Sequence, residues 1–370
     1  METAENITLS VDTPYGLLNA LAISQNTMAP ECVIECSAGS NMFGGTPMQE
    51  LQQATDYINS IDGSFAKSQL RATSYEYRQY PFSHRASVKI NRAYMCTVKE
   101  LNDVRCVAAE IGNLLRAKLG KRYTFEQTVW EYQKWINQYF DYKNTGHISD
   151  HTAIGLLTNR TGVCQAIAAV TMLVFPHLGY QVVYVSGNAK GNNGWGPHAW
   201  NAVHTEKGWV HVDFTFGMSG FITPSTNNAI FTKAFRQDHK WDEHCYSPES
   251  MTKCIELHKG VYNSHIELYE NKKTLIVGNV VVNTSEPVLI GNKTDGHWVN
   301  LFRLLPLVGG ACELLPKQDQ LRICLRNKEF LINCASSFVN RKNGFVKVSI
   351  INTFASILGG SDTSIEFKVR

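Results

Sequence analysis

The sequence predicts an α+β protein whose central part is a helix with a cysteine at its start, packed on an antiparallel sheet. Three observations favour this fold class. Two helical patterns run between residues 97 and 139, an apolar helix follows from Cys164 to about Leu178, and strand-like runs then cover 181–186, 198–204 and 209–216. Because these strands follow one another without intervening helices, we expect an antiparallel sheet against the cysteine helix.

The two helices ahead of the cysteine have clear N-terminal signals. Thr97 is followed three residues later by Glu100, and Thr124 three residues later by Gln127, which is the pattern of a capping box. Apolar residues then repeat at helical spacing, and the first helix is expected to end at Gly120.

Four segments are expected along the chain. Residues 1–95 form an N-terminal α+β region, and 96–220 form the core that carries the cysteine helix. Residues 221–273 are polar and are interpreted as a linker or extension. Residues 274–370 contain short strands with helical insertions and are expected to form a separate accessory domain of mixed α/β type.

The composition is that of an ordinary folded protein. Of 370 residues, 44% are hydrophobic, which is enough for two or three domains. Thirty-five Lys+Arg face 32 Asp+Glu without basic runs, which argues against nucleic acid as a partner. The longest apolar stretches, such as 166–175, are about half as long as a membrane-spanning helix, so no transmembrane segment is expected. Ten cysteines show no framework spacing and leave disulfides, such as Cys312 with Cys324, open.

Cys164 is a candidate nucleophile because of its position. It begins the apolar helix directly after a turn at Thr161 and Gly162, where the helix dipole favours a thiolate over a thiol. A buried structural role is nevertheless the commoner one for any single cysteine. Position alone therefore does not decide between the two roles.

A predicted hairpin brings a histidine and an aspartate together. If the turn at 205–208 joins the last two strands, Trp200 falls opposite Asp213, and His198 falls opposite Thr215. Alternate side chains share one face, so His198 and Asp213 become diagonal neighbours.

A carboxylate at that distance fixes the tautomer of the imidazole and leaves its other nitrogen free to take a proton from a thiol. Singly, His198 and Asp213 are more often ordinary strand residues. Together with Cys164, they favour a Cys-His-Asp catalytic triad.

The same region resembles the core of the bacterial transglutaminase-like superfamily, which has a papain-like thiol active site. The resemblance covers about Tyr123 to Gly217, and the helix end with Phe140-Asp141-Tyr142 is similar to the segment that leads into that core. By position, it places the nucleophile on Cys164, the histidine on His198 and the acid on Asp213. Its motifs are Gly162-Val163-Cys164-Gln165-Ala166, His198-Ala199-Trp200-Asn201 and Trp209-Val210-His211-Val212-Asp213-Phe214-Thr215.

The triad and the resemblance together imply thiol acyl-enzyme chemistry on protein or peptide amides. The Cys164 thiolate would attack an amide carbonyl, and a second nucleophile would resolve the thioester. With water the protein is a cysteine peptidase or amidase, which we favour because cross-linking is not the default expectation among the bacterial relatives. With a lysine amine it is a transglutaminase that cross-links glutamine residues. The third alternative is a non-catalytic cell-surface or cell-wall binding protein with a vestigial site, although no triad member is missing.

The C-terminal segment contains a repeat in which 301–310 matches 351–360 at an offset of 50 residues. The residues from Gly296 onward resemble the stalk modules called copper amine oxidase N-terminal-like domains, which accompany secreted bacterial enzymes. This resemblance favours a secreted or cell-surface location and contact with a cell-wall or surface component. The N-terminus lacks a signal-peptide pattern, which leaves the cytoplasm open.

No cofactor and no metal are expected. The polar run 238–245 contains Asp238, His239, Asp242, Glu243, His244 and Cys245 and is interpreted as a solvated loop. The second donor of an oxyanion hole, beside the backbone amide of Cys164, stays open. Asn159 and Gln165 are candidates, and either could equally be an ordinary turn or helix residue.

Overall fold

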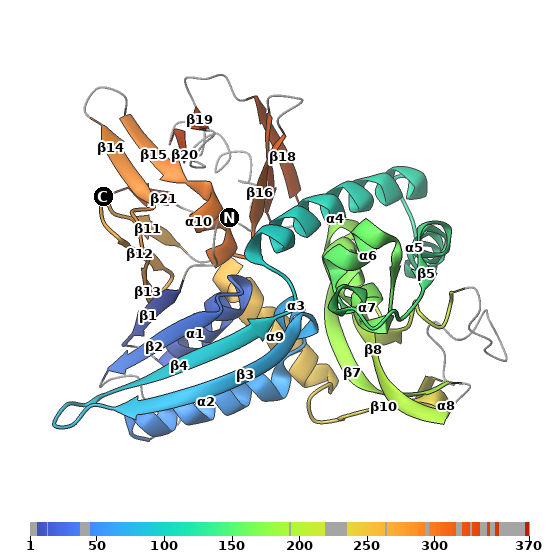
Figure 1. Ribbon diagram of the computed structural model, residues 1–370, viewed down its shortest axis with the longest axis horizontal. Helices are drawn as coiled ribbons and strands as arrows, with labels where there is room; N and C mark the ends of the chain where they lie inside the picture. Colours follow the sequence, from blue (N-terminus) through green and yellow to red (C-terminus); the bar gives the residue numbers. More distant parts are fainter. Residues whose placement is uncertain are drawn as a thin grey trace. The chain divides into compact units, whose positions relative to one another are not determined.

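The structure of the 370-residue chain is a computed structural model. It describes residues 6–12, 14–37, 45–191, 194–218, 235–262, 265–292, 296–315, 320–325, 328–333, 339–340, 345–347 and 367–369. These residues divide between two compact units, which are described separately (Figure 1). The first unit consists of Met1–Asn59, Ala72–Tyr94 and Glu256–Arg370, and the second of Ser60–Arg71 and Met95–Ile255.

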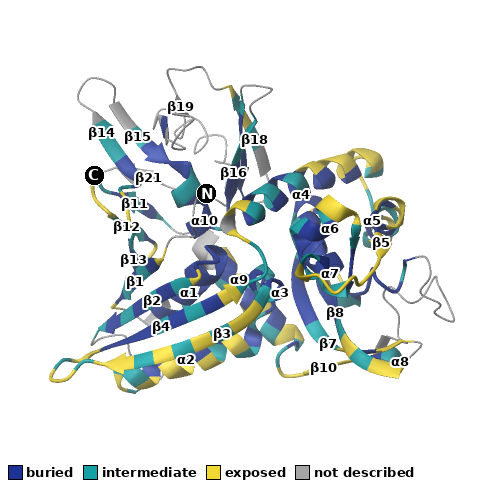
Figure 2. Cartoon of the chain, viewed as in Figure 1, coloured by how far each residue is buried: buried dark blue, intermediate teal, exposed yellow. Residues whose placement is uncertain are grey.

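The first unit is built on an eight-stranded sheet. In sheet order, its strands are β21 (Phe367–Val369), β11 (Ile266–Leu268), β12 (Thr274–Val277), β13 (Val280–Asn283), β1 (Ile7–Val11), β2 (Glu31–Ser37), β4 (Arg85–Tyr94) and β3 (Leu70–Gln79). Strand β1 is parallel to β2 and antiparallel to β13. Figure 2 shows the contrast between the buried residues of β1 and β2 and the largely exposed β3.

Helices and two smaller sheets complete this unit. The helices are α1 (Pro14–Asn26), α2 (Pro47–Ile61) and α10 (Leu301–Leu307). One sheet contains β14 (Leu289–Asn292), β15 (Gly296–Asn300), β20 (Phe345–Lys347) and β19 (Val339–Asn340), and the other contains β16 (Ala311–Leu315), β17 (Gln320–Leu325) and β18 (Lys328–Asn333).

A single apolar cluster joins the N-terminal and C-terminal parts of the first unit. Leu9 and Ile34 belong to the same buried cluster as Val282 and Leu304. The predicted division into an N-terminal region ending at 95 and a separate domain from 274 differs from this arrangement. Local periodicity identified the strands, but the pairing of β1 with β13 joins residues that are more than 260 positions apart, which no local pattern can indicate.

The predicted C-terminal repeat is described only in its first copy. This copy forms the expected strand, short helix and glycine stop, as β15, α10 and Gly309, which has φ 70°. The second copy, 351–360, lies outside the described residues. In the same part of the chain, Ala311 pairs with Cys324 and Cys312 pairs with Ile323. Cys312 and Cys324 therefore lie on opposite faces of their strands, which does not favour a disulfide between them.

The second unit has the predicted helix-then-sheet order. Its helices are α3 (Phe65–Ser68), α4 (Val98–Leu119), α5 (Phe125–Tyr139), η1 (Ile148–His151), α6 (Ala153–Asn159), α7 (Cys164–Val174), η2 (Phe175–Leu178) and α8 (Phe235–Asp238), and α9 (Pro248–Tyr262) begins here. Its antiparallel sheet has the order β10 (His239–Trp241), β7 (Gln181–Gly191), β8 (Gly194–Thr205) and β9 (Gly208–Val212). A short parallel pair joins β5 (Asp141–Tyr142) to β6 (Thr161–Gly162).

The local signals at the helix ends of this unit are confirmed. Both capping boxes form, at Thr97 with Glu100 and at Thr124 with Gln127, and Gly120 ends α4. Helices α4 and α5 pack with α7 and the inner face of the sheet in one buried cluster. The predicted α+β class, with a cysteine helix against an antiparallel sheet, is confirmed. Within the described residues, no helix is long and apolar enough to cross a membrane.

Candidate active site

Cys164 is the first residue of α7, as predicted. The helix is tied to the sheet by Asn201 of β8, whose side-chain amide donates to the backbone oxygens of Ala168 (3.1 Å) and Val183 (3.4 Å). Cys164 itself is only partly buried, unlike most of the helix that follows it. Its thiol therefore lies at a rigid helix N-terminus and is reachable from outside.

The predicted hairpin register is confirmed. Asn201 pairs with Val212 and Thr205 pairs with Gly208, so the same register continued by one residue sets Trp200 opposite Asp213. Strand β9 ends at Val212, before the predicted limit near 216. Its end is the point where Asp213 leaves the ladder.

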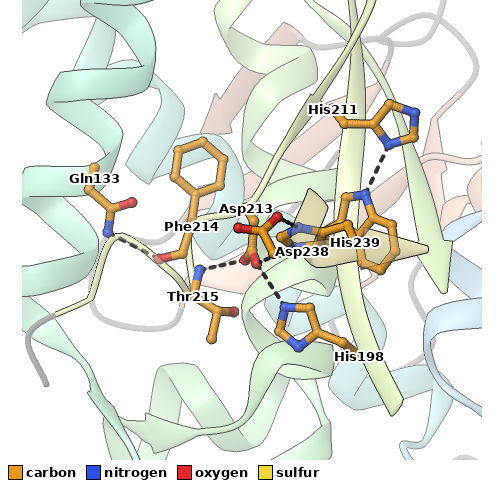
Figure 3. Close-up of polar contacts among 9 residues, drawn as sticks. Gln133, His198, His211, Asp213, Phe214, Thr215, Asp238 and His239 are labelled. Carbon is orange, nitrogen blue, oxygen red and sulfur yellow. Dashed lines mark hydrogen bonds and ion pairs between the residues drawn. The ribbon is translucent and has the colours of Figure 1, made fainter. Parts of the chain in front are cut away.

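His198 and Asp213 are in direct contact. His198 Nε2 lies 2.8 Å from Asp213 Oδ2, and the two side chains are 8% and 1% exposed (Figure 3). A carboxylate only accepts hydrogen bonds, so Nε2 donates and Nδ1 is left to accept. The ring of His198 is also within hydrogen-bonding reach of the Cys164 thiol. The structure thus brings together all three residues singled out in the sequence.

The carboxylate of Asp213 is held by further donors. The backbone N–H of Thr215 donates to Oδ1 at 2.9 Å, which closes a turn and stops the strand. Gln133 of α5 donates to the carbonyl oxygen of Phe214 at 3.2 Å and so fixes this turn from the other side (Figure 3). The position of Asp213 is therefore set by the helix layer as well as by the sheet.

Opposite charges dominate the electrostatics of this pair. Burial disfavours protonation of His198, but the charge of Asp213 and the hydrogen bond to it outweigh burial and raise the pKa of His198 to about 10. Burial alone would raise the pKa of Asp213, but the charges and hydrogen bonds of His198 and His239 hold that pKa well below its usual range. The pair therefore stabilises the imidazolium that forms when Nδ1 of His198 takes up a proton.

A second histidine, His239 of β10, lies at the site although it was not predicted as a site residue. Its Nε2 lies 3.1 Å from Asp213 Oδ2, and its Nδ1 lies 2.7 Å from Asp238 Oδ1 (Figure 3). The interpretation of 238–245 as a solvated loop is wrong for His239, whose side chain is fully buried. The reason is the pairing of β10 with β7, which places a three-residue strand in the sheet and its histidine behind Asp213.

Aromatic rings surround the imidazole of His198. The ring of Phe216 has its centroid 5.3 Å away, and that of Trp200 lies 5.9 Å away in a stacked geometry. The indole N–H of Trp200 donates to His211 Nδ1 at 2.9 Å. Burial first, and then nearby positive charge, lowers the pKa of His211 to about 4, so its ring stays neutral and able to accept. These rings shield the His198–Asp213 bond from water.

Three of these side chains also have the ligand types of a metal site. Nitrogen atoms of His198 and His239 and an oxygen of Asp213 lie within 4.8 Å of one another, and zinc binds such atoms. In this structure Nε2 of each histidine is hydrogen-bonded to Asp213 Oδ2. A bound metal would have to replace both bonds.

The sequence candidates for a second oxyanion donor are placed elsewhere. The side-chain amide nitrogen of Gln165 donates to the backbone oxygen of Ser68 at 2.7 Å, and its oxygen lies 3.2 Å from His151 Nδ1. Asn159 is exposed in the last turn of α6. Neither side chain is directed to the thiol by these contacts.

Gly187 of β7 allows β10 to approach so closely. A Cβ atom there would lie 2.2 Å from the backbone oxygen of Lys240 and 2.8 Å from Trp200 Cη2. We expect Gly187→Ala to displace β10, to withdraw His239 from Asp213 and to cost about 1–3 kcal/mol of unfolding free energy through overpacking. Gly191→Ala on the same strand has nothing within 4 Å and is the matched control. Thermal unfolding of both variants checks this, and equal Tm values would contradict it.

Comparison with known proteins gives the class of this unit. Residues 115–214 match the family model of the transglutaminase-like superfamily. Cys164, His198 and Asp213 all lie within the match, whereas His239 lies beyond it. The part of the chain that carries the candidate site is therefore similar to the core of the transglutaminase-like superfamily. The match does not extend to the C-terminal segment, whose resemblance to stalk modules stays a prediction.

Two solved structures are similar to the chain at 14% identity. One is described as a TGase; the similarity covers 53% of this chain and 52% of the other, with a TM-score of 0.27. The second is a candidate cysteine protease from Cytophaga hutchinsonii. The similarity covers 48% of this chain and 73% of the other, with a TM-score of 0.26. The chain thus spans about half the length of the first of these proteins. No curated protein matches the chain.

Proposed function

We propose that the protein is a thiol acyl-transfer enzyme in which Cys164 is the nucleophile, His198 the general base and Asp213 the residue that orients the histidine. The observation that carries the proposal is the 2.8 Å bond from His198 to Asp213, with the ring of the same histidine in reach of a thiol at a helix N-terminus. These are the nucleophile, base and orienting group that activated-thiol catalysis needs.

In the proposed reaction, the sulfur of Cys164 attacks the carbonyl carbon of an amide in a protein or peptide substrate. The thiol proton passes to His198 and then to the departing amine, and a thioester remains on the enzyme. Water then attacks the thioester, the acid product leaves, and the thiol is regenerated. We favour this hydrolysis, which makes the protein a cysteine peptidase or amidase.

The acceptor is tested with a glutamine-containing peptide and a fluorescent primary amine. Hydrolysis converts the glutamine to glutamate, or cleaves the chain, with no incorporation of the amine. Cross-linking chemistry incorporates the amine with release of ammonia. Dominant incorporation would replace hydrolysis by transamidation and leave the assignment of the nucleophile unchanged.

The nucleophile is tested by brief alkylation with iodoacetamide at about pH 6, followed by intact-mass analysis and peptide mapping. We expect the label on Cys164. Cys96 and Cys245, the other half-exposed cysteines among the described residues, serve as internal controls. Burial raises the pKa of Cys96 to about 12, and burial together with Asp242 raises the pKa of Cys245.

His198→Ala should lose most of this labelling, at least tenfold in rate, because the imidazole no longer supports the thiolate. The control is His204→Gln, an exposed histidine on the same strand, which should label like the wild type. Equal labelling of Cys96, Cys164 and Cys245 would contradict the proposal that Cys164 is an activated nucleophile. It would favour a binding protein with a vestigial site.

A further inference from the structure

The proposed mechanism lacks one group. In the tetrahedral intermediate of acyl transfer, the former carbonyl oxygen carries negative charge and is stabilised by two or more hydrogen-bond donors. The backbone N–H of Cys164, at the first turn of α7, supplies one donor. The second must lie beside the same amide, and the side chain of Gln165 is instead bonded to Ser68 and in contact with His151.

Strand β5 brings another side chain to this place. Tyr142 pairs with Gly162, two residues before Cys164. The backbone N–H of Asp141 donates to the oxygen of Arg160 at 2.9 Å, and that of Lys143 donates to the oxygen of Gly162 at 3.0 Å. These two bonds flank Tyr142 and fix its backbone relative to the start of α7.

The hydroxyl of Tyr142 then reaches Cys164. The backbone N–H of Cys164 donates to the hydroxyl oxygen, which lowers the pKa of Tyr142, and a hydrogen bond with the Cys164 thiol raises that pKa. Burial, reinforced by the charge of Cys164, raises the pKa of Tyr142 to about 12, so the phenol keeps its proton across the neutral range. Tyr142 as a whole residue is 37% exposed.

We propose that the Tyr142 hydroxyl is the second donor of the oxyanion hole, acting with the backbone N–H of Cys164. This inference rests on the proposed function. As the sulfur bonds to the carbonyl carbon, the C=O π pair moves onto oxygen, and that oxygen accepts from both donors. When the intermediate collapses, the pair returns to form the thioester carbonyl and the bond to the leaving group breaks. Tyr142 gives up no proton in either step.

A different role would follow from the same contact. A hydroxyl bonded to a thiol could instead cover it and hold the resting enzyme inactive. The two roles predict opposite effects of removing the hydroxyl. Loss of an oxyanion donor slows acylation of Cys164, whereas loss of a group that blocks the thiol speeds it.

The test uses Tyr142→Phe with 4-nitrophenyl acetate as acyl donor and iodoacetamide as a second reagent. Acylation by the ester releases 4-nitrophenolate in a burst and passes through an oxyanion. Alkylation by iodoacetamide displaces iodide at a saturated carbon and forms no oxyanion. We expect the burst rate to fall about 10²-fold, while the alkylation rate of Cys164 stays within about threefold.

Tyr139→Phe is the matched control. Tyr139 has the same 37% exposure, lies three residues earlier at the end of α5, and its ring contact with Trp135 survives loss of the hydroxyl. Its burst and alkylation rates should equal those of the wild type.

The outcomes separate the inference from the proposed function. If the wild type gives no burst, or if Cys164→Ala keeps it, the proposed function fails and the inference fails with it. If the wild type gives a Cys164-dependent burst that Tyr142→Phe leaves unchanged, only the inference fails. A faster burst together with faster alkylation in Tyr142→Phe would show that the hydroxyl blocks the Cys164 thiol, and it would overturn the donor role.

Discussion

Replacing Asp213 with Asn is expected to lower the rate of Cys164 acylation by about 10⁴-fold while the protein stays folded. The amide has nearly the shape of the carboxylate, so the backbone bond from Thr215 to Oδ1 can persist. At the other oxygen position an NH₂ group now faces His198 Nε2 and His239 Nε2, which both point at a single acceptor in the native site. The histidine must then keep its proton on Nδ1, the nitrogen needed to accept from the thiol.

The burst of 4-nitrophenolate measures this effect, and near-UV circular dichroism together with Tm verifies the fold. Asp238→Asn is the comparison variant, for which a smaller effect is expected. Asp238 contacts Nδ1 of His239, the nitrogen that faces away from Asp213, and its side chain is 34% exposed. We expect it to cost no more than about tenfold. A folded Asp213→Asn protein that is acylated within tenfold of the wild-type rate would exclude the orienting role.

The second large effect concerns the stability of the protein as pH rises. The folded pKa of His198 is about 10, above the value of about 6.5 for an unperturbed histidine. A raised folded pKa stabilises the native state fully below about pH 6.5, and this contribution is lost as pH rises through about 10. At ~1.4 kcal/mol per pKa unit, the contribution is at most about 5 kcal/mol. Asp213 behaves in the opposite sense: its contribution is present above about pH 4 and is lost in acid.

Urea unfolding of the wild type and of His198→Gln, at about pH 6 and about pH 10.5, isolates the contribution of His198. The difference in unfolding free energy between the wild type and His198→Gln should be smaller by several kcal/mol at the higher pH. His204→Gln, on the exposed side of the same strand, should show no such change. A difference that stays constant between the two pH values would mean that His198 is not held as an imidazolium.

The contact of His198 with Asp213 and the place of Cys164 at the start of a helix could be predicted because both depend on local sequence. A turn of four residues sets the register of β8 with β9, and this register alone makes His198 and Asp213 neighbours. The capping boxes and the helix that starts at Cys164 are also local features. Strand β9 is shorter than predicted, because Asp213 turns its own carboxylate back to the chain.

His239 could not be predicted in the same way. It lies 26 residues after Asp213, on a strand of three residues that is too short to show an alternating pattern. Its burial comes from the pairing of β10 with β7 and from the absence of a side chain at Gly187, which are both features of tertiary structure. Tyr142 was visible as part of a motif, but its contact with Cys164 requires the non-local pairing of β5 with β6.

The position of β1 in its sheet has a consequence for how the protein is made. During synthesis, β1 and β2 leave the ribosome first, but the neighbour of β1 on its other edge, β13, follows more than 260 residues later. Until then the edge of β1 has no partner from this chain, and such edges invite pairing with other chains. The second unit consists of 60–71 and 95–255, all of which is synthesised before β13. We therefore expect the second unit of the nascent chain to form while the sheet of the first unit is still incomplete.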